Sequence, residues 1–481
     1  MHGTTKAEGC AHLRLGNFCR LLPELPTWAE ECGIQHQCEA ERVAAALGAP
    51  GSIMHDADHS SPDSDIPAGY TFFAQFVDHD ITLDTGTQLH GRPLAGEEID
   101  SRPNLRSASL DLDCVYAFGP EASPFLYDHS QPGRLLVGST VGGVENPNDV
   151  PRSSEGRALI GDPRNDENLF VSQLQLLFLR FHNRRLVGRG FEEAQRDVRF
   201  HYQWIVLYDF LKRVCHPEVY EFALPKIEMS AREHNPDNRD YPFCSILDDC
   251  GRICMPVEFS GAAYRFGHTL VRSQYPVNAD HPVIELFDER FGTLGFGQVP
   301  PSLTVDWRFL LDVDPCHPYA HSKAVDSLLA DELIRLPDPV VGRSASDNDR
   351  SLAFRNLLRG YVLGLPSGQR AVQALHEKGY PVEPCQDLKF ADLSGWACLG
   401  DLPCDPAAHT PLFLYVLREG AVRGQGKTLG PVGSAILLEV FGSMFVHCDT
   451  FFREKAGWEP DPCIAGPYGL SLADLVRYLS S

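Results

Sequence analysis

The chain has 481 residues, of which 43% are hydrophobic and 22% charged, and its formal net charge is -23 at pH 7. This balance is typical of a globular protein with a large core. The acidic charge argues against nucleic acids and anionic membrane surfaces as partners, because both repel such a protein.

The N-terminal residues 1–18 contain no continuous apolar run and no small-residue cleavage site, so a secretory signal is not expected. The 15 cysteines are dispersed from Cys10 to Cys463 without a CxxC motif. This pattern favours reduced, mostly buried thiols and a cytoplasmic location over a disulfide framework. We expect an N-terminal arm over residues 1–65 and one mainly α-helical domain with long irregular loops over residues 66–481.

The first stretch with chemical character is FFAQFVDHD, residues 72–80. On a helix, Gln75, Asp78 and His79 lie near one face, whereas Asp80 points elsewhere. One face then offers a base, an amide and a carboxylate. His79 is therefore either a hydrogen-bonded structural histidine or part of one wall of a reaction site.

The next stretch, RSASLDLDCVY (106–116), places oxygen-bearing side chains at alternate positions. In extended backbone, Ser107, Ser109, Asp111 and Asp113 would point the same way. The stretch is either an edge strand with one wet face or a site for Ca²⁺, which prefers hard oxygen ligands. In the second case Asp80 is a candidate for a further ligand.

The segment GDPRNDEN (161–168) opens a helix predicted over residues 166–186, which has apolar spacing, acidic residues at its start and arginines at its end. Arg164 and Glu167 are three residues apart. They form either an exposed ion pair of little energetic value or a site where a cation stabilises developing negative charge.

Arg265 and His268 are three residues apart on a small-residue helix predicted over 258–272. His268 is either a core histidine or an axial ligand beneath a flat cofactor, with Arg265 reaching the carboxylates of that cofactor. The stretch 433–452 is apolar but contains Glu439, so it is expected to be a buried core helix rather than a membrane span. Further helices are predicted near residues 193–213, 321–336, 368–378, 410–419, 431–453 and 471–480, and Pro/Gly/Asp-rich connections at 85–105, 141–163 and 273–304.

These segments, in this order, resemble the animal haem peroxidase family of the peroxidase–cyclooxygenase superfamily. The matching motifs are FAQFVDHDIT, SASLDLDCVY, GDPRNDEN, AAYRFGHTL and LAFRNLLRGYVLGLPSG. The C-terminal LGPVGSAILLEVFG resembles family members outside animals. The resemblance covers residues 66 to 455. It implies a haem peroxidase that reduces H₂O₂ and oxidises small donors, such as phenols or halides, through a ferryl intermediate.

The resemblance also implies a role for each matching residue. His79 would be the distal base, Arg164 the distal cation and Gln75 a residue of the peroxide or halide pocket. His268 would bind the haem iron, and Asn356 would accept a hydrogen bond from the ring N–H of His268. Arg265 and Arg359 would face the propionates of haem b, Asp78 and Glu167 would form ester links to it, and calcium would be bound by Asp80, Ser107, Ser109 (through its carbonyl), Asp111 and Asp113.

Three departures from the family pattern limit the resemblance. After Arg359, GYVLGLP lacks the charged residues of the mammalian peroxidases, which leaves donor access in doubt. Asn168 stands where one animal member has a methionine bonded to a haem vinyl group, so that bond is not expected here. No secretory signal is expected, unlike in the secreted animal enzymes, which puts a role in extracellular killing or matrix cross-linking in doubt. A response to oxidative stress is the expected context.

Two other functions stay open. The first is a fatty-acid dioxygenase of the same superfamily, whose radical tyrosine typically lies three residues before the proximal histidine. That position is Arg265 here, and Tyr264, four residues before, is expected on a different helical face. The second is a non-catalytic haem-binding protein. The expected partners are H₂O₂ and a small electron donor, with no nucleic acid and no membrane span.

Overall fold

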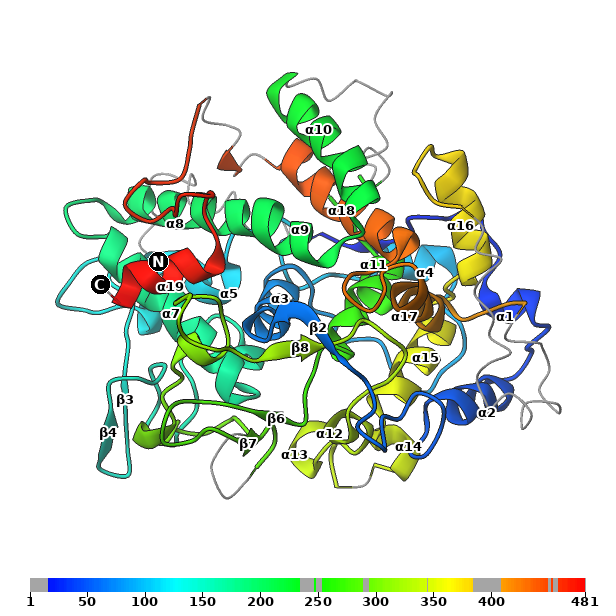
Figure 1. Cartoon of the computed structure of the whole chain (residues 1–481), viewed down its shortest axis with the longest axis horizontal. Coiled ribbons are helices and arrows are strands. Elements are labelled where there is room, and N and C mark those ends of the chain that lie inside the picture. The colour runs from blue at the N-terminus through cyan, green and yellow to red at the C-terminus, as the bar shows by residue number, and fades with distance from the viewer. Residues whose placement is uncertain are drawn as a thin grey trace, which may run out of the picture.

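The computed structural model describes residues 16–233, 246–247, 253–288, 294–343, 345–383, 408–448, 451–452 and 457–480. As predicted, the chain is mainly α-helical, with few strands, and forms a single domain around one hydrophobic core (Figure 1). The α-helices are α1 (Trp28–Glu31), α2 (Gln37–Gly48), α3 (Gly69–Ile81), α4 (Gly96–Asp100), α5 (Asp113–Tyr116), α6 (Gly119–Ala122), α7 (Leu169–Arg185), α8 (Phe191–Ile205), α9 (Leu211–Val214), α10 (Pro217–Glu233), α11 (Val257–Gly261), α12 (Asp331–Ile334), α13 (Asp338–Val341), α14 (Asp347–Arg350), α15 (Leu352–Val362), α16 (Gly368–Glu377), α17 (Leu412–Val422), α18 (Pro431–His447) and α19 (Leu472–Ser480).

The strands of the described residues form separate two-stranded pairs rather than a larger sheet. The pairs are β1 (Phe18–Cys19) with β5 (Met255–Pro256), β2 (Asp63–Pro67) with β8 (His321–Lys323), β3 (Ser139–Val141) with β4 (Val144–Asn146), and β6 (Gln274–Tyr275) with β7 (Ile284–Glu285). The β1–β5 pair is parallel and the others are antiparallel.

Most of the predicted helices are present, and two are not. The stretch 321–336 contains β8 and the short α12 instead, because the first residues of the stretch pair with β2. The helix predicted over 258–272 ends early. Ala262, with φ -138° and ψ -71°, terminates α11, and the chain continues as a 3₁₀ helix, η5 (Ala263–His268).

Helix α18 is the buried core helix that the sequence predicts for this apolar stretch. Every residue from Pro431 to Phe445 is buried, including Glu439, whose carboxylate accepts a hydrogen bond from Tyr380. The helix packs against α10, α17 and η5. Within the described part of the chain, no helix has the length and apolarity needed to cross a membrane.

The cysteine prediction is wrong for three residues. Cys19 and Cys254 form a disulfide with 5.7 Å between their Cα atoms, and Cys32 is also disulfide-bonded. The β1–β5 pairing brings together residues 235 positions apart, a proximity that sequence spacing does not reveal. The predicted cytoplasmic location was based on reduced thiols, so these disulfides remove that argument for it.

The N-terminal residues pack into the same core as the rest of the chain. Phe18, Leu21 and Leu22 are buried, and the backbone N–H groups of Leu21 and Leu22 donate to the buried carboxylate of Glu258 at 2.9 and 3.0 Å. The boundary between an arm over residues 1–65 and the domain stays a prediction.

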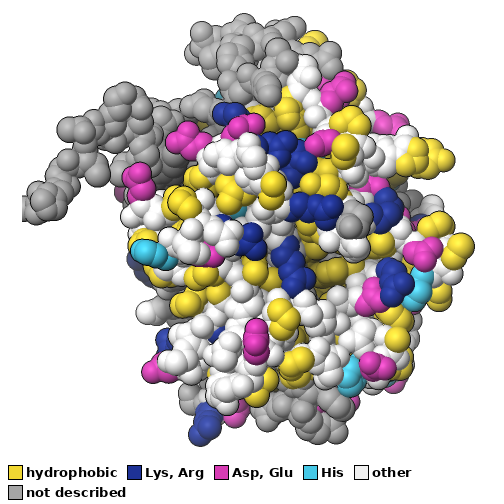
Figure 2. Space-filling model, turned by 90° about the vertical axis from the view of Figure 1, so that its left-hand side faces the viewer, with side chains coloured by type: hydrophobic (Ala, Val, Ile, Leu, Met, Phe, Trp, Pro, Cys, Tyr) yellow, Lys and Arg dark blue, Asp and Glu magenta, His cyan; other side chains and the backbone are white. Residues whose placement is uncertain are grey.

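The acidic net charge is not spread evenly over the surface. Figure 2 shows a face on which Lys and Arg side chains gather near the centre, among apolar and uncharged groups. A small anionic or neutral molecule therefore does not meet uniform repulsion on this face.

Candidate active site

A cavity of about 410 Å³ lies between α3, the start of α7, η5 and α15. In Figure 1, α3 lies near the centre of the molecule, with α7 on one side and α11 and α15 on the other. The polar side chains that line it include those of Gln75, Asp78, His79, Asp84, Arg164, Glu167, Asn168, Tyr264, Arg265, His268 and Arg359. The structure thus brings together the residues that the sequence predicts for both sides of a flat cofactor, except Asn356, which contacts His268 directly.

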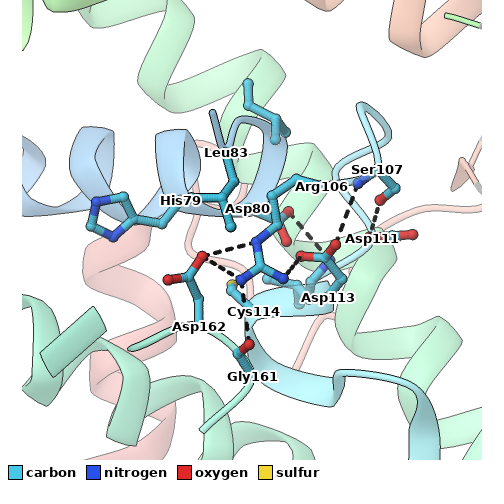
Figure 3. Close-up of polar contacts among 12 residues, drawn as sticks. His79, Asp80, Leu83, Arg106, Ser107, Asp111, Asp113, Cys114, Gly161 and Asp162 are labelled. Atoms are coloured by element: carbon cyan, nitrogen blue, oxygen red, sulfur yellow. Dashed lines mark hydrogen bonds and ion pairs between the residues drawn. The ribbon is translucent and has the colours of Figure 1, made fainter. Parts of the chain in front are cut away.

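Helix α3 sorts its side chains as its periodicity predicts. Gln75, Asp78 and His79 line the cavity, while Phe73 and Phe76 are buried in the core. Asp80 points away from His79, as Figure 3 shows, and its carboxylate accepts a hydrogen bond from the backbone N–H of Leu112 at 3.2 Å. Neighbouring residues of one helix therefore serve two different sites.

His79 is 5% exposed and is held by a buried amide. Its Nδ1 lies 2.7 Å from Oδ1 of Asn165, and its Nε2 lies 3.6 Å from Oε1 of Glu167. Burial and the charge of Arg164 lower the pKa of His79 to about 3. The imidazole is therefore neutral at physiological pH and can act as a base.

Arg164 is fixed at the cavity wall by three acceptors. Its guanidinium donates to the carbonyls of His79 and Thr82 at 3.1 and 2.7 Å and to the carboxylate of Asp162 at 2.7 Å. Burial would raise the pKa of Asp162, but Arg164 and Arg106 lower it to about 2. A preorganised cation next to His79 can stabilise negative charge that develops in the cavity.

Asp78 and Glu167, the two predicted ester carboxylates, both line the cavity. Burial raises the pKa of Asp78, which accepts a hydrogen bond from the Thr82 hydroxyl at 2.9 Å. Burial raises the pKa of Glu167 to about 7 even though Gln75 donates to its carboxylate. Asn168 caps α7 and donates to Oε1 of Gln75 at 3.1 Å. The amide of Gln75 therefore connects the two cavity walls.

His268 is reached by Asn356, but the hydrogen bond is oriented differently from the prediction. Nδ2 of Asn356, not its oxygen, lies 2.9 Å from Nδ1 of His268. The amide oxygen instead accepts a hydrogen bond from Arg265 at 2.8 Å. Burial and the neighbouring Arg265 lower the pKa of His268 to about 3, so the ring is neutral.

Two half-buried arginine side chains give the cavity a cationic edge. Burial and the charge of Arg359 lower the pKa of Arg265 to about 10, and burial also lowers the pKa of Arg359. Arg265 is hydrogen-bonded to the carbonyl of Ser260 and to Asn356 rather than to a carboxylate, and Asp84 is 3.7 Å from Arg359. Half-buried cations that have no close carboxylate partner fit a ligand that carries carboxylates of its own.

Tyr264 lines the same cavity, so the prediction that it faces elsewhere is wrong. In the 3₁₀ helix, Arg265 and His268 are three residues apart and share a face. Tyr264 also reaches the cavity wall. The Tyr264 hydroxyl donates to the carbonyl of Ala74 at 3.1 Å.

The acidic loop is not the extended strand that its alternating pattern predicts. Leu110 and Leu112 have φ of 47° and 59°, in the left-handed region, and the chain turns sharply before α5. This turn gathers carboxylate oxygens of Asp80, Asp111 and Asp113 to within 4.8 Å of one another. Burial and the charge of Asp111 raise the pKa of Asp80 to about 7. Three carboxylates so close together fit a bound cation.

The predicted serine ligands lie beside this cluster. The Ser107 hydroxyl donates to Asp111 at 2.8 Å, and the Ser109 hydroxyl donates to that of Ser107 at 3.0 Å. Both side chains therefore belong to the hydrogen-bond network of the acidic cluster.

Sequence reasoning did not identify Arg106, Asn165 or Asp162. Figure 3 shows Arg106 between Asp162 and Asp113, with its guanidinium 2.5 Å from the carboxylate of Asp162 and 3.5 Å from that of Asp113. Arg106 thereby connects the acidic cluster to the carboxylate that holds Arg164. In the GDPR segment, Asp162 lies two residues before Arg164, and this spacing is the signal that could have identified Asp162. The position of Arg106 depends on tertiary structure.

The sequence model of the animal haem peroxidase family matches residues 93–291. This match confirms the resemblance to the animal haem peroxidase family that the motifs predict.

Similar solved structures include both a peroxidase and dioxygenases. Peroxidase A from Dictyostelium discoideum matches with a TM-score of 0.59 and 14% identity, over 97% of this chain and 93% of that one. A fatty acid alpha-dioxygenase from Oryza sativa matches with a TM-score of 0.58 and 14% identity, over 95% of this chain and 78% of that one. The Arabidopsis thaliana enzyme of the same name matches with a TM-score of 0.58 and 14% identity, over 97% and 76%. No curated protein sequence matches the chain. At this identity the likeness shows the fold and leaves the reaction open.

Proposed function

We propose that the chain is a haem peroxidase that reduces H₂O₂ and oxidises small donors such as phenols or halides. The observation that carries this proposal is the pairing of a neutral, buried His79 with a preorganised Arg164 in the cavity that also contains His268. Haem b would supply the redox chemistry, with His268 holding its iron and Arg265 and Arg359 facing its propionates. The cationic edge formed by these two arginines supports the fit.

The residues account for the proton and charge movements that peroxide reduction requires. His79 can take a proton from H₂O₂ and return it to the leaving oxygen, because burial keeps its imidazole neutral. Arg164 stabilises the negative charge on that oxygen, since its guanidinium is already held in place by Asp162 and two carbonyls.

Purified protein should absorb in the Soret region and oxidise a phenol, iodide or bromide only when H₂O₂ is added. Steady-state assays with each donor, alongside an unsaturated fatty acid with O₂, test the proposal. Peroxide-dependent oxidation of at least one donor is expected. O₂ uptake with the fatty acid, without peroxide-dependent donor oxidation, would contradict the proposal.

A fatty-acid dioxygenase is the second candidate, because of two features of the cavity. Tyr264 lines the cavity at the wall that carries His268, where a radical tyrosine could act. One side of the cavity is also strongly apolar, formed by Leu286, Phe287, Leu333, Leu336, Val340 and Leu352. An acyl chain would bury apolar surface there.

Calcium is the cation that we propose for Asp80, Asp111 and Asp113, with the hydroxyl of Ser107 and the carbonyl of Ser109 completing the site. Without a cation, Asp80 stays protonated up to about pH 7 in the folded chain but ionises near pH 4 when unfolded. The folded state then binds more protons over this window, so the stability of the metal-free protein falls as pH rises from about 4 to 7.

Chelator-treated protein should therefore unfold at a lower temperature at pH 7 than at pH 5, and added Ca²⁺ should remove most of this difference. Calorimetry at the two pH values, with and without Ca²⁺, is the measurement. The Asp111→Asn, Asp113→Asn double variant should lose the Ca²⁺ effect. An absence of calcium in active wild-type protein, by metal analysis, would rule this site out.

Ester links between haem and the carboxylates of Asp78 and Glu167 are also proposed. Because such links form oxidatively, we expect acidified acetone to leave haem on wild-type protein after exposure to H₂O₂. The Asp78→Ala, Glu167→Ala double variant should release it, and peptide mapping should find no link at Asn168, which has no thioether. Complete extraction of haem from peroxide-treated wild type would show that both carboxylates are only polar neighbours.

A further inference from the structure

A chain of buried hydrogen bonds leads from His79 to a backbone carbonyl. Oδ1 of Asn165 is 2.7 Å from Nδ1 of His79, and Nδ2 of Asn165 donates to Oε1 of Gln175 at 2.8 Å. Nε2 of Gln175 donates in turn to the carbonyl of Cys114 at 3.2 Å. Asn165 and Gln175 are both 0% exposed, so water cannot replace these partners.

The carbonyl at the end of this chain fixes the direction of every bond in it. The Cys114 carbonyl can only accept, so Gln175 must present its amide nitrogen to it and its oxygen to Asn165. Asn165 must then present its nitrogen to Gln175 and its oxygen to His79. An oxygen at Nδ1 requires N–H there, and a neutral imidazole has only one N–H. The lone pair of His79 is therefore on Nε2.

The two ends of the chain are well anchored. Cys114 lies in α5, and the carbonyl of Cys114 packs against Gly161, where a Cβ atom would approach its oxygen to 2.6 Å. Nε2 of His79 is 3.6 Å from Glu167, beyond hydrogen-bond distance, so no competing acceptor there draws the proton to it.

We propose that Asn165 and Gln175 are positioning residues that hold His79 in the tautomer with its lone pair on Nε2, with the Cys114 carbonyl as the reference point. This inference rests on the proposed function in one respect, that His79 is the base for H₂O₂. If the Asn165 amide turned over, its NH₂ group would face Nδ1 and the ring proton would move to Nε2. His79 could then no longer accept a proton from H₂O₂.

The variant Gln175→Met tests the proposal, because methionine fills similar space without fixing the Asn165 amide. The rate constant for reaction of the haem-loaded enzyme with H₂O₂ should fall by about 10-fold or more. Gln173→Met is the matched control. Gln173 is also buried on α7 and donates to the carbonyl of Asn148 at 2.8 Å, but it has no link to His79. This control should keep the wild-type rate constant.

The double variant Asn165→Asp, Gln175→Met provides a rescue that a merely structural role would not give. A carboxylate accepts from Nδ1 in either orientation, so the tautomer no longer depends on Gln175. The rate constant should return to within about 3-fold of wild type. If Gln175→Met does not retain haem, the rate constants of Asn165→Ala and Asn165→Asp are compared instead. These two variants test the same acceptor at Nδ1 of His79.

Infrared spectra of the reduced protein with carbon monoxide give a readout besides turnover. A proton on Nε2 would donate to the bound ligand and lower its C–O stretching frequency. Gln175→Met should therefore gain a lower-frequency band that wild type, Gln173→Met and the double variant lack.

The positioning role would be overturned if Gln175→Met kept the wild-type rate constant and C–O band while His79→Ala reacted slowly with H₂O₂. That result would leave the proposed function intact. A wild-type rate constant in His79→Ala would overturn both. The tautomer assignment would also be contradicted if Gln175→Met reacted slowly with H₂O₂ and shifted the C–O band, but the added Asn165→Asp substitution did not restore the rate constant.

Discussion

Replacing His79 with alanine is expected to slow the reaction with H₂O₂ by about 10²- to 10⁴-fold while haem stays bound. The variant removes the group that moves the peroxide proton but leaves Arg164 in place. Since the pKa of His79 is about 3, titration of His79 itself should add no pH dependence to the wild-type rate constant between about 5 and 8. Stopped-flow mixing with H₂O₂ measures both quantities.

His182→Ala is the matched control for this variant. His182 is also buried and has a lowered pKa, of about 4, but it bonds to Tyr116 and to the carbonyl of Gly133, away from the cavity. Its loss should leave the rate constant within about 3-fold of wild type, provided that haem content is unchanged. An unaltered rate constant in His79→Ala would place the base elsewhere.

Replacing His268 with alanine is expected to abolish haem retention or peroxidase turnover. His268 lies on the tight η5 helix with Arg265, and within the described part of the chain the cavity lining contains only His79 as another histidine. Loss of the imidazole removes the nitrogen that would hold iron. The ratio of haem absorbance to protein absorbance, measured after gel filtration, reports the loss directly.

The control for this variant is His201→Ala, which removes a buried histidine on α8 that contacts the backbone of Asp197 and Asp461. This change should affect thermal stability more than haem content, because His201 does not line the cavity. If His268→Ala kept the wild-type haem content and turnover, His268 could not be the residue that holds the haem iron.

The sequence predicts the site best where one helix carries it. The face of α3 with Gln75, Asp78 and His79 follows from helical spacing alone, as does the divergence of Asp80. The length of α7 and the burial of α18 also follow from their apolar patterns.

The prediction fails where the geometry depends on local backbone irregularity or on distant partners. Two leucines with positive φ bend the acidic loop, and nothing in their side chains signals that conformation. Ala262 divides a predicted helix into α11 and η5, and Tyr264 of η5 lies on the cavity wall. Asn165 and Gln175 meet only through tertiary packing. The Cys19–Cys254 disulfide requires the parallel pairing of strands that are far apart in sequence.

The stoichiometry of a single turnover tests the central claim most directly. Haem-loaded protein is mixed with one equivalent of H₂O₂ and an excess of a phenol that yields a detectable radical, in a cell with an oxygen electrode. A peroxidase converts one H₂O₂ and two phenols into two waters and two phenoxyl radicals, so two radicals per peroxide and no O₂ uptake are predicted. Absence of donor oxidation, together with O₂ uptake when an unsaturated fatty acid replaces the phenol, would contradict the account and assign the cavity to the dioxygenase reaction.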